Sequence, residues 1–321
     1  MLLSVRGLRT GFFTDQGVSW PVDDVTFNVP PGETVGLVGE SGSGKSMVAL
    51  SIIGLVPPPG RVVDGEILFD GRDLRRLSRS ELREVRGGGI GMVFQDATTS
   101  LNPVYRVGDQ IAAVMRLHRG MNATDARSEA IHLLGDLGIV DPEERARAYP
   151  HEMSGGMRQR AMIAVAVAGR PRLLIADEPT TGLDATVQAE ICDLLKWIQG
   201  EHDMSILLIS HDLGMVVEMS DHVMVMYAGR LVEVGHWSML AADPLHPYTK
   251  ALVAAVPHLG AGSSRPLKGI PGTVPDLAAL PPGCAFEPRC PMAVQGCSNG
   301  PPPLTDVGDR LCACYEVRGD R

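Results

Sequence analysis

Eight consecutive residues near the start of the chain have the types and spacing of a loop that cradles nucleotide phosphates. They fit the pattern G-x-x-x-x-G-K-[ST] and are Gly39, Glu40, Ser41, Gly42, Ser43, Gly44, Lys45 and Ser46. Phosphate oxygens need several backbone N–H groups at once, so the backbone must approach closely and bend where side chains would clash, which requires glycine. Lys45 can bring a positive charge to the terminal phosphates, and Ser46 can offer a hydroxyl ligand to Mg²⁺.

The segments on either side of this loop are those that such a site requires. Residues 33–38 predict a buried strand, and the apolar run 47–55 predicts a helix whose N-terminus faces the phosphates. Met47 begins that run and is predicted to be one of the nucleotide-binding residues. A chance glycine-rich turn is the alternative, and the strand–loop–helix order favours a nucleoside triphosphate site over it.

Polar side chains follow three later strands at the points where those strands end. Residues 173–178 predict an apolar strand that ends in Asp177 and Glu178, and such acids point toward the ligand crevice of a parallel sheet. Asp177 suits Mg²⁺ coordination, directly or through water, and Glu178 suits polarising the attacking water. Solvated strand-end acids are the alternative. His211, after the strand 206–209, could donate a hydrogen bond to the terminal phosphate, and Gln95 ends the strand 90–95.

Two further features are weaker signals on their own. Phe12 and Phe13 lie in a segment expected to be a turn-rich insert, residues 10–20, where one ring could stack on a purine base or pack beneath the sheet. A glycine pair stands at the predicted start of an apolar helix, in the segment Ser154, Gly155, Gly156 and Met157. Backbone N–H groups and the positive end of the helix dipole at such a start can bind an anion. Between these features, residues 105–147 change to a helical period and predict an insert in a strand-rich core.

Composition and charge limit the classes of protein. The 321 residues are 44% hydrophobic and 21% charged, as in globular proteins, and they include no run of about 18 apolar residues. No signal peptide is recognised, so a cytosolic location is expected. The net charge of −9 disfavours a nucleic-acid partner, since the basic cluster 72–86 alternates with acids and predicts a solvated helix face.

Five of the six cysteines lie close together near the C-terminus. Their pattern is C-x5-C-x6-C-x14-C-x-C over residues 284–314, whereas Cys192 sits alone in an apolar helical pattern as a core residue. Disulfides are not expected in a cytosolic protein. Four thiolates suit Zn²⁺ or a [4Fe–4S] cluster, and spacing does not decide between them. Free thiols on a loose tail are the alternative.

Taken together, these motifs resemble the nucleotide-binding domain of an ABC transporter. The chain shows a Walker A loop at 39–46, a Q-loop at Gln95, a signature loop at 154–157, a Walker B strand at 173–178, a D-loop at Asp184 and a switch histidine at His211. Finer similarity to the ATP-binding subunits of oligopeptide/dipeptide and nickel importers rests on residues 94–96, 100–103, 150–160, 176–181, 226–230, 246–249 and 283–291. Met153 and Met157 depart from the general ABC pattern, although the importer subfamily commonly has methionine at the position of Met157. Gly182 is a conservative departure, since close relatives often have alanine there.

The resemblance implies an α/β fold with a P-loop, RecA-like core, an antiparallel β subdomain and a helical subdomain. The ABC ATPase domain would span 1–235, with its helical subdomain at about 96–158. A cysteine-rich extension of the oligopeptide-transporter type would span 236–321. In that extension, the resemblance implies a [4Fe–4S] cluster, with Zn²⁺ as the alternative, on Cys284, Cys290, Cys297 and Cys314. It leaves Cys312 spare, although the choice between Cys312 and Cys314 stays open.

The resemblance also implies a mechanism and partners. Two such domains would face head to tail, so that the Walker A loop of one and the signature loop and Asp184 of the other enclose each ATP. Glu178 would activate water, His211 would sense the γ-phosphate, and Ser46 and Gln95 would bind Mg²⁺. The partners would be a second ATP-binding subunit, generally a related chain rather than a copy, two membrane permease subunits and, indirectly, an extracytoplasmic peptide-binding protein. The chain would lie at the cytoplasmic face of the membrane.

Two other classes of function compete with peptide import. A soluble ABC ATPase acting on DNA or ribosomes usually has two ATPase domains or a long coiled-coil insert, whereas this chain has one set of motifs and a short insert. A nucleotide-dependent scaffold that does not hydrolyse ATP would not need Glu178 and His211. The transported substrate is not encoded in these motifs.

Overall fold

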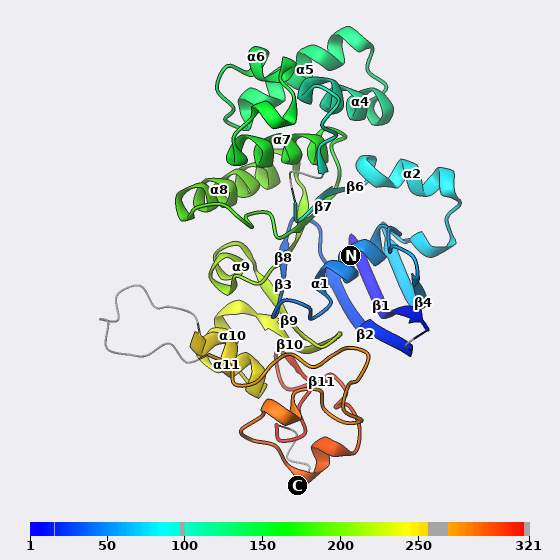
Figure 1. Ribbon diagram of the computed structural model, residues 1–321, viewed down its shortest axis with the longest axis vertical. Helices are drawn as coiled ribbons and strands as arrows, with labels where there is room; N and C mark the ends of the chain where they lie inside the picture. Colours follow the sequence, from blue (N-terminus) through cyan, green and yellow to red (C-terminus); the bar gives the residue numbers. More distant parts are fainter. Residues whose placement is uncertain (16, 97–99, 256–268, 318–321) are drawn as a thin grey trace.

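Two β-sheets organise the computed structural model, which describes residues 1–15, 17–96, 100–255 and 269–317 (Figure 1). The smaller sheet is antiparallel with the strand order β2-β1-β4-β5. Its strands are β1 (Leu3–Thr14), β2 (Gly17–Val29), β4 (Gly60–Phe69) and β5 (Arg72–Asp73). This sheet is the antiparallel β subdomain that the sequence predicted.

The prediction of a turn-rich insert over residues 10–20 was wrong. Strand β1 continues to Thr14 and β2 begins at Gly17, and the two strands pair as far as Thr14 with Gly17. The physical reason is the composition of the segment, in which aromatic and β-branched side chains favour an extended, half-buried backbone. These side chains are those of Phe12, Phe13, Val18 and Trp20.

The larger sheet carries the elements that lead to the candidate site. Its strand order is β11-β12-β10-β9-β3-β8-β7-β6, and the five strands from β9 to β6 run parallel. Those five are β3 (Thr34–Val38), β6 (Ile90–Val93), β7 (Leu173–Asp177), β8 (Ser205–Ser210) and β9 (His222–Tyr227). Strands β3, β7 and β8 are buried throughout and nearly all apolar, as expected for a parallel sheet covered on both faces. Their carboxyl ends meet at one edge of the sheet.

Helices cover the larger sheet and form a layer of their own at one end of the molecule, where α4 to α7 gather (Figure 1). Asn122 caps α5 by accepting a hydrogen bond from the Asp125 N–H at 3.0 Å. Cys192 is buried in α8, which confirms its prediction as a core residue. In chain order the helices are α1 (Lys45–Ile52), α2 (Arg79–Gly88), α4 (Val107–Arg119), α5 (Ala123–Asp136), α6 (Pro142–Arg147), α7 (Gly155–Val167), α8 (Ala185–His202), α9 (Leu213–Met219), α10 (Trp237–Ala242) and α11 (Pro247–Ala255). Across the part of the chain that the structure describes, every helix is too short or too polar to span a bilayer.

The segment after residue 235 is joined to the core sheet. Strand β12 (Leu311–Cys312) pairs antiparallel with β10 (Arg230–His236), and β11 (Thr305–Asp306) pairs with β12 at the edge. Three buried rings add an aromatic contact between the two parts: those of Tyr227, Tyr248 and Phe286 lie with centroids 4.7 to 5.4 Å apart. In Figure 1 this segment forms the end of the molecule opposite to helices α4–α7. It is thereby held close to the phosphate-loop side of the sheet.

Candidate functional site

The loop 39–46 connects the end of β3 directly to the first turn of α1. Gly42 and Gly44 have φ values of 81° and 105°, a region that favours glycine. A Cβ atom on Gly44 would collide with the carbonyl oxygen of Pro21, and one on Gly39 with the carbonyl oxygen of Met226. These glycines are therefore required by backbone conformation and by close packing of neighbouring chain segments.

Lys45 lies inside the loop rather than in solvent. Its ammonium Nζ donates hydrogen bonds to the backbone carbonyls of Gly39 at 2.8 Å and Glu40 at 3.0 Å. Burial lowers the pKa of Lys45, and the charges of Glu178, Asp177 and Glu40 oppose that shift. The loop thus surrounds a buried cation with backbone groups, an arrangement suited to an anionic ligand.

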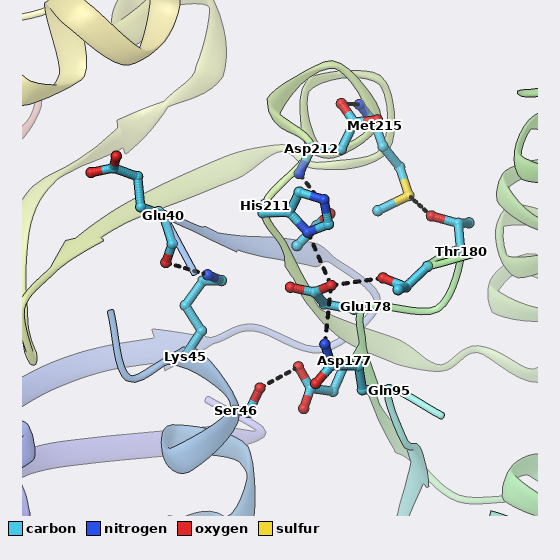
Figure 2. Close-up of polar contacts among 12 residues, drawn as sticks. Glu40, Lys45, Ser46, Gln95, Asp177, Glu178, Thr180, His211, Asp212 and Met215 are labelled. Carbon is cyan, nitrogen blue, oxygen red and sulfur yellow. Dashed lines mark hydrogen bonds and ion pairs between the residues drawn. The ribbon is translucent and has the colours of Figure 1, made fainter. Parts of the chain in front are cut away.

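Ser46 and Asp177 bring two oxygen groups together beside the loop. The Ser46 hydroxyl donates a hydrogen bond to Asp177 Oδ1 at 3.0 Å (Figure 2). Asp177 is buried at the end of β7, and burial raises its pKa to about 6. A hydroxyl and a carboxylate at this distance are ligands that Mg²⁺ prefers.

Three donors converge on one carboxylate oxygen of Glu178, as Figure 2 shows. Glu178 Oε2 accepts from Thr181 Oγ1 at 2.7 Å, lies 2.9 Å from His211 Nδ1 and lies 3.5 Å from Gln95 Nε2. Burial acts to raise the pKa of Glu178, but the hydrogen bonds from Thr181 and His211 outweigh it and lower the pKa overall. Glu178 is therefore held ionised, as a group that accepts a proton from water must be.

These groups surround one hollow of about 280 Å³. It is bordered by the phosphate loop on one side and by Gln95 and Glu178 on the other. A triphosphate in the loop would thus have its terminal phosphate on the side of the hollow that Glu178 borders. The lining residues are Pro21, Ser41, Gly42, Gly44, Lys45, Ser46, Met47, Gln95, Glu178 and Leu277.

Three residues of the site were not predicted from the sequence. Thr181 donates the shortest of the three hydrogen bonds to Glu178. The two threonines after Pro179 were a signal for such a donor, but the sequence does not indicate which of the two it is. Pro21 and Leu277 line the hollow from distant parts of the chain, and their types carry no signal for chemistry.

The predicted signature and D-loop residues lie apart from this hollow. Ser154 caps α7 by accepting from the Met157 N–H at 3.3 Å, with Gly155 and Gly156 forming the first turn. Asp184 caps α8 in the same way, accepting from two backbone N–H groups at 3.1 Å. Ser154, Gly155 and Asp184 are exposed, and none of these residues lines the hollow within one chain.

Phe12 and Phe13 are likewise absent from the lining of the hollow. The Phe13 ring packs edge-on against Trp20, with centroids 6.0 Å apart, and the Arg61 guanidinium lies 4.2 Å above it. Phe12 lies against Gly60 on the neighbouring strand β4. Stacking of either ring on a base stays a prediction.

Four of the five C-terminal cysteines border one small cavity. Cys284, Cys290, Cys297 and Cys314 line it together with His246. Burial raises the pKa of Cys284 to about 11 and raises that of Cys290 as well. Within the described residues, no three His, Cys, Asp or Glu side chains lie as a metal ion would require.

Comparisons with known proteins agree with this geometry. The family described as ABC transporter matches residues 22–181, and the family described as oligopeptide/dipeptide transporter, C-terminal region, matches residues 232–297. A proposed peptide import ATP-binding protein of Brucella abortus is 49% identical over 313 residues, covering 98% of this chain and 94% of that protein. One from Brucella melitensis is also 49% identical, covering 98% of each.

Solved structures show the same fold. An ATP-binding cassette in a dimeric post-hydrolysis state, bound to ADP and Pi, superposes with a TM-score of 0.66 at 25% identity, covering 73% of this chain and 98% of that one. The cbiO1 protein of Clostridium perfringens, part of the ABC transporter complex cbiONQ, gives a TM-score of 0.64 at 28% identity, covering 75% and 91%. From these similarities and the site geometry, we conclude that the chain belongs to the ATP-hydrolysing ABC transporter family and carries the C-terminal region of its oligopeptide/dipeptide branch.

Proposed function

We propose that this chain binds Mg-ATP in the loop 39–46 and hydrolyses it to drive the import of di- or oligopeptides. The observation that supports hydrolysis here is the convergence of Thr181, His211 and Gln95 on one oxygen of Glu178, beside the hollow of the phosphate loop. The peptide substrate is supported by the relatives and by the matched C-terminal region.

In this proposal the chain's own residues divide the work. Lys45 exchanges its carbonyl partners for the terminal phosphates, and the loop N–H groups hold the phosphate oxygens. Ser46 and Gln95 would hold Mg²⁺, and Asp177 would support it directly or through water. When bound, Mg²⁺ neutralises developing charge on the phosphates. Glu178 accepts the proton of the attacking water, and His211 holds the terminal phosphate by a hydrogen bond.

We further propose that a second ATP-binding subunit completes each site. Residues 154–157 and Asp184 lie outside the hollow of their own chain. They stand at the N-termini of α7 and α8, where the positive end of the helix dipole suits a phosphate held by another chain. The partner is a related chain, and two membrane permease subunits and an extracytoplasmic peptide-binding protein complete the importer. The chain then works at the cytoplasmic face of the membrane.

The division of the chain is part of this proposal. The ATPase domain spans residues 1–235, with a helical subdomain at about 96–158, and the extension spans 236–321. The helical subdomain passes closure of the ATP site to the permease subunits.

We also propose that the extension holds a [4Fe–4S] cluster on Cys284, Cys290, Cys297 and Cys314. Support comes from the common cavity of these four thiols, together with the position of Cys312 elsewhere, opposite Glu233 on β10. The four thiols must lose their protons to bind any metal, and a cation among them would stabilise the thiolate form, which burial disfavours at Cys284 and Cys290. Anaerobic purification followed by iron, sulfide and zinc analysis tests this, and zinc in a colourless protein would replace the cluster by Zn²⁺.

The test of the main proposal is phosphate release by the anaerobically purified chain, with and without co-expressed partner and permease subunits. We expect turnover to rise in the complex and to vanish in Glu178→Gln while Mg-ATP binding persists. Glu218→Gln serves as the control, because Glu218 is exposed and pairs with Lys196 on the surface. Brisk hydrolysis by Glu178→Gln would remove Glu178 from the role of base. Turnover stimulated by DNA or ribosomes, and indifferent to the permease, would contradict the importer assignment.

A further inference from the structure

Arg289 of the cysteine-bearing segment reaches the phosphate loop, 249 residues earlier in the chain. Its two terminal nitrogens form a fork on the Glu40 carboxylate, with Nη1 at 2.8 Å from Oε2 and Nη2 at 3.1 Å from Oε1. The Arg289 side chain is only 5% exposed, so this ion pair is screened far less than a surface pair. Glu40 is the second residue of the phosphate loop.

The position of the Arg289 guanidinium is fixed from several sides. Its Nε donates to the carbonyl of Pro271 at 2.7 Å, and Nη1 also donates to the Tyr227 hydroxyl at 3.2 Å. Tyr227 ends strand β9, which neighbours β3 in the core sheet. The arginine is therefore part of the packing between the extension and the sheet, and Glu40 receives a preset partner.

A second contact binds the backbone of the same loop residue. The Glu40 N–H donates a hydrogen bond to the Tyr248 hydroxyl at 2.9 Å, and Tyr248 is fully buried in α11. The Glu40 carbonyl in turn accepts a hydrogen bond from Lys45 Nζ at 3.0 Å. The backbone donor and the carboxylate of Glu40 are thus both held by residues beyond 235, while its carbonyl holds the lysine of the loop.

A third residue of the extension reaches the site itself. Leu277 lines the same hollow as Lys45 and Ser46. The hollow of the phosphate loop therefore has one wall built by the extension.

We propose that Arg289 and Tyr248 are positioning residues for the phosphate loop, through which the C-terminal extension presets the backbone of the loop at Glu40 for the triphosphate. This rests on the proposed function, in which the loop 39–46 binds Mg-ATP. An unbound loop that already has its bound shape loses less conformational entropy when the ligand arrives, which increases affinity. The effect belongs to nucleotide binding, because neither residue touches Glu178 or its three donors.

The experiment measures the Kd of Mg-ATP in the Glu178→Gln background, where turnover does not interfere, and KM and kcat in the otherwise unchanged assembled complex. We expect Arg289→Gln to raise Kd and KM about tenfold or more, since a buried hydrogen bond to a charged group is lost. We expect kcat to change less than about twofold. An interaction that stabilises the bound substrate and the transition state equally affects KM when it is lost and leaves kcat unchanged. Arg289→Lys, which keeps the charge but not the fork, is expected to give an intermediate Kd.

Arg310→Gln is the matched control. Arg310 also joins the extension to the body and is 10% exposed, but it pairs with Asp243 at 3.0 Å and Glu233 at 3.8 Å and not with Glu40. We expect it to lower thermal stability while leaving Kd within about twofold of its starting value, because it orders the extension without touching Glu40. An equal loss of affinity in Arg310→Gln would overturn the proposal, since the loop would then respond only to the folding of the extension.

Two more variants keep the outcome decisive. Tyr248→Phe removes a single hydroxyl from a buried ring, so it folds even where Arg289→Gln does not, and its Kd is expected to rise by about fivefold. Unchanged Kd in both Tyr248→Phe and any folded Arg289 variant contradicts the proposal. Lys45→Ala separates this result from failure of the proposed function: if it keeps full Mg-ATP affinity, the loop is not the nucleotide site, and if it alone loses affinity, only the role of Arg289 and Tyr248 fails.

Discussion

Thr181 Oγ1 donates a 2.7 Å hydrogen bond to Glu178 Oε2, three residues earlier in the chain. Glu178 has a φ of 49°, and its N–H donates to the Ile209 carbonyl at 2.8 Å on the adjacent strand β8. This backbone conformation turns the carboxylate back toward its own loop, where the threonine can reach it. The threonine thereby sets both the direction and the charge of the candidate base.

Replacement of Thr181 by valine is expected to change the pH dependence of hydrolysis. The hydrogen bond from Thr181 lowers the pKa of Glu178, so its loss raises that pKa and leaves less of the carboxylate ionised under acidic conditions. We expect the acidic limb of the kcat profile to move to higher pH, by about one unit or less. Phosphate release measured from neutral pH down to below 4.5, the ordinary pKa of a glutamate, provides the test.

Thr180→Val is the matched control for that variant. It makes the same chemical change at the neighbouring residue, where the hydroxyl contacts Met215 Sδ instead of Glu178. Its acidic limb is expected to coincide with that of the unchanged protein. An identical shift in both variants would mean that the loop conformation, and not the hydrogen bond, determines the titration.

Replacement of Gly44 by alanine is expected to disable nucleotide binding. The new Cβ would collide with the Pro21 carbonyl and would also stand at a φ of 105°, so the loop must move. We expect the affinity for Mg-ATP to fall at least about tenfold, with a loss of about 2 kcal/mol or more in the free energy of unfolding. Isothermal titration and denaturant unfolding measure the two quantities.

Gly120→Ala tests whether backbone strain alone produces this loss. Gly120 ends α4 with a φ of 65°, and a Cβ there would meet nothing within 4 Å. We expect a cost of about 1 kcal/mol in stability and no change in Mg-ATP affinity. If Gly44→Ala behaves no worse than Gly120→Ala, close packing against Pro21 is not what requires the glycine.

The predicted residues that the structure brings close together are those whose signals are local in sequence. The phosphate loop and the end of β7 each need only a short run of residues, in which glycines or strand-end acids have a direct physical reason. The structure places Lys45, Asp177 and Glu178 together as those signals implied. The same local reasoning failed for residues 10–20, because charged and glycine-containing sequence suggested turns where strand-forming side chains dominate.

The contacts that were not predicted join distant parts of the chain. Arg289 and Glu40 are each ordinary charged residues, and nothing in either local sequence names the other as its partner. Leu277 lines the hollow for the same reason, since its place depends on how the extension folds back. Such pairings are determined by tertiary packing, which periodicity and motif spacing do not encode.

We expect His246 to lower the free energy of unfolding as the solution becomes acidic. Burial lowers its pKa to about 3, and the charge of Lys250 contributes further, whereas the ordinary value is 6.5. The unfolded chain therefore takes up a proton that the folded chain excludes, so stability is fully present above pH 6.5 and is lost as the pH falls toward 3.

His246→Asn isolates this contribution. The asparagine carbonyl can replace Nδ1, which accepts a hydrogen bond from the Tyr248 N–H at 3.0 Å. Between pH 6.5 and 4, we expect the unfolding free energy of the unchanged protein to fall more steeply than that of the variant, by up to about 1.4 kcal/mol per pH unit. Above about pH 7, histidine is mostly neutral in both the folded and the unfolded chain, so the two curves should run parallel. Parallel curves across the whole range would show that His246 binds its proton equally well in the folded and unfolded chains.

Cys314 and Cys312 are expected to differ in metal retention although only one residue separates them. Cys314 lines the cavity shared with Cys284, Cys290 and Cys297, whereas Cys312 is fully buried in β12, paired with Glu233 across the strands. Strand β12 ends at Cys312, so the alternation that places residues two apart on one face of a strand does not extend to Cys314. After anaerobic purification, Cys314→Ser should lose bound iron or zinc, and Cys312→Ser should keep the metal content of the unchanged protein. Equal loss in both variants would make Cys312 a ligand, and a metal-free parent protein would establish the cysteines as free thiols.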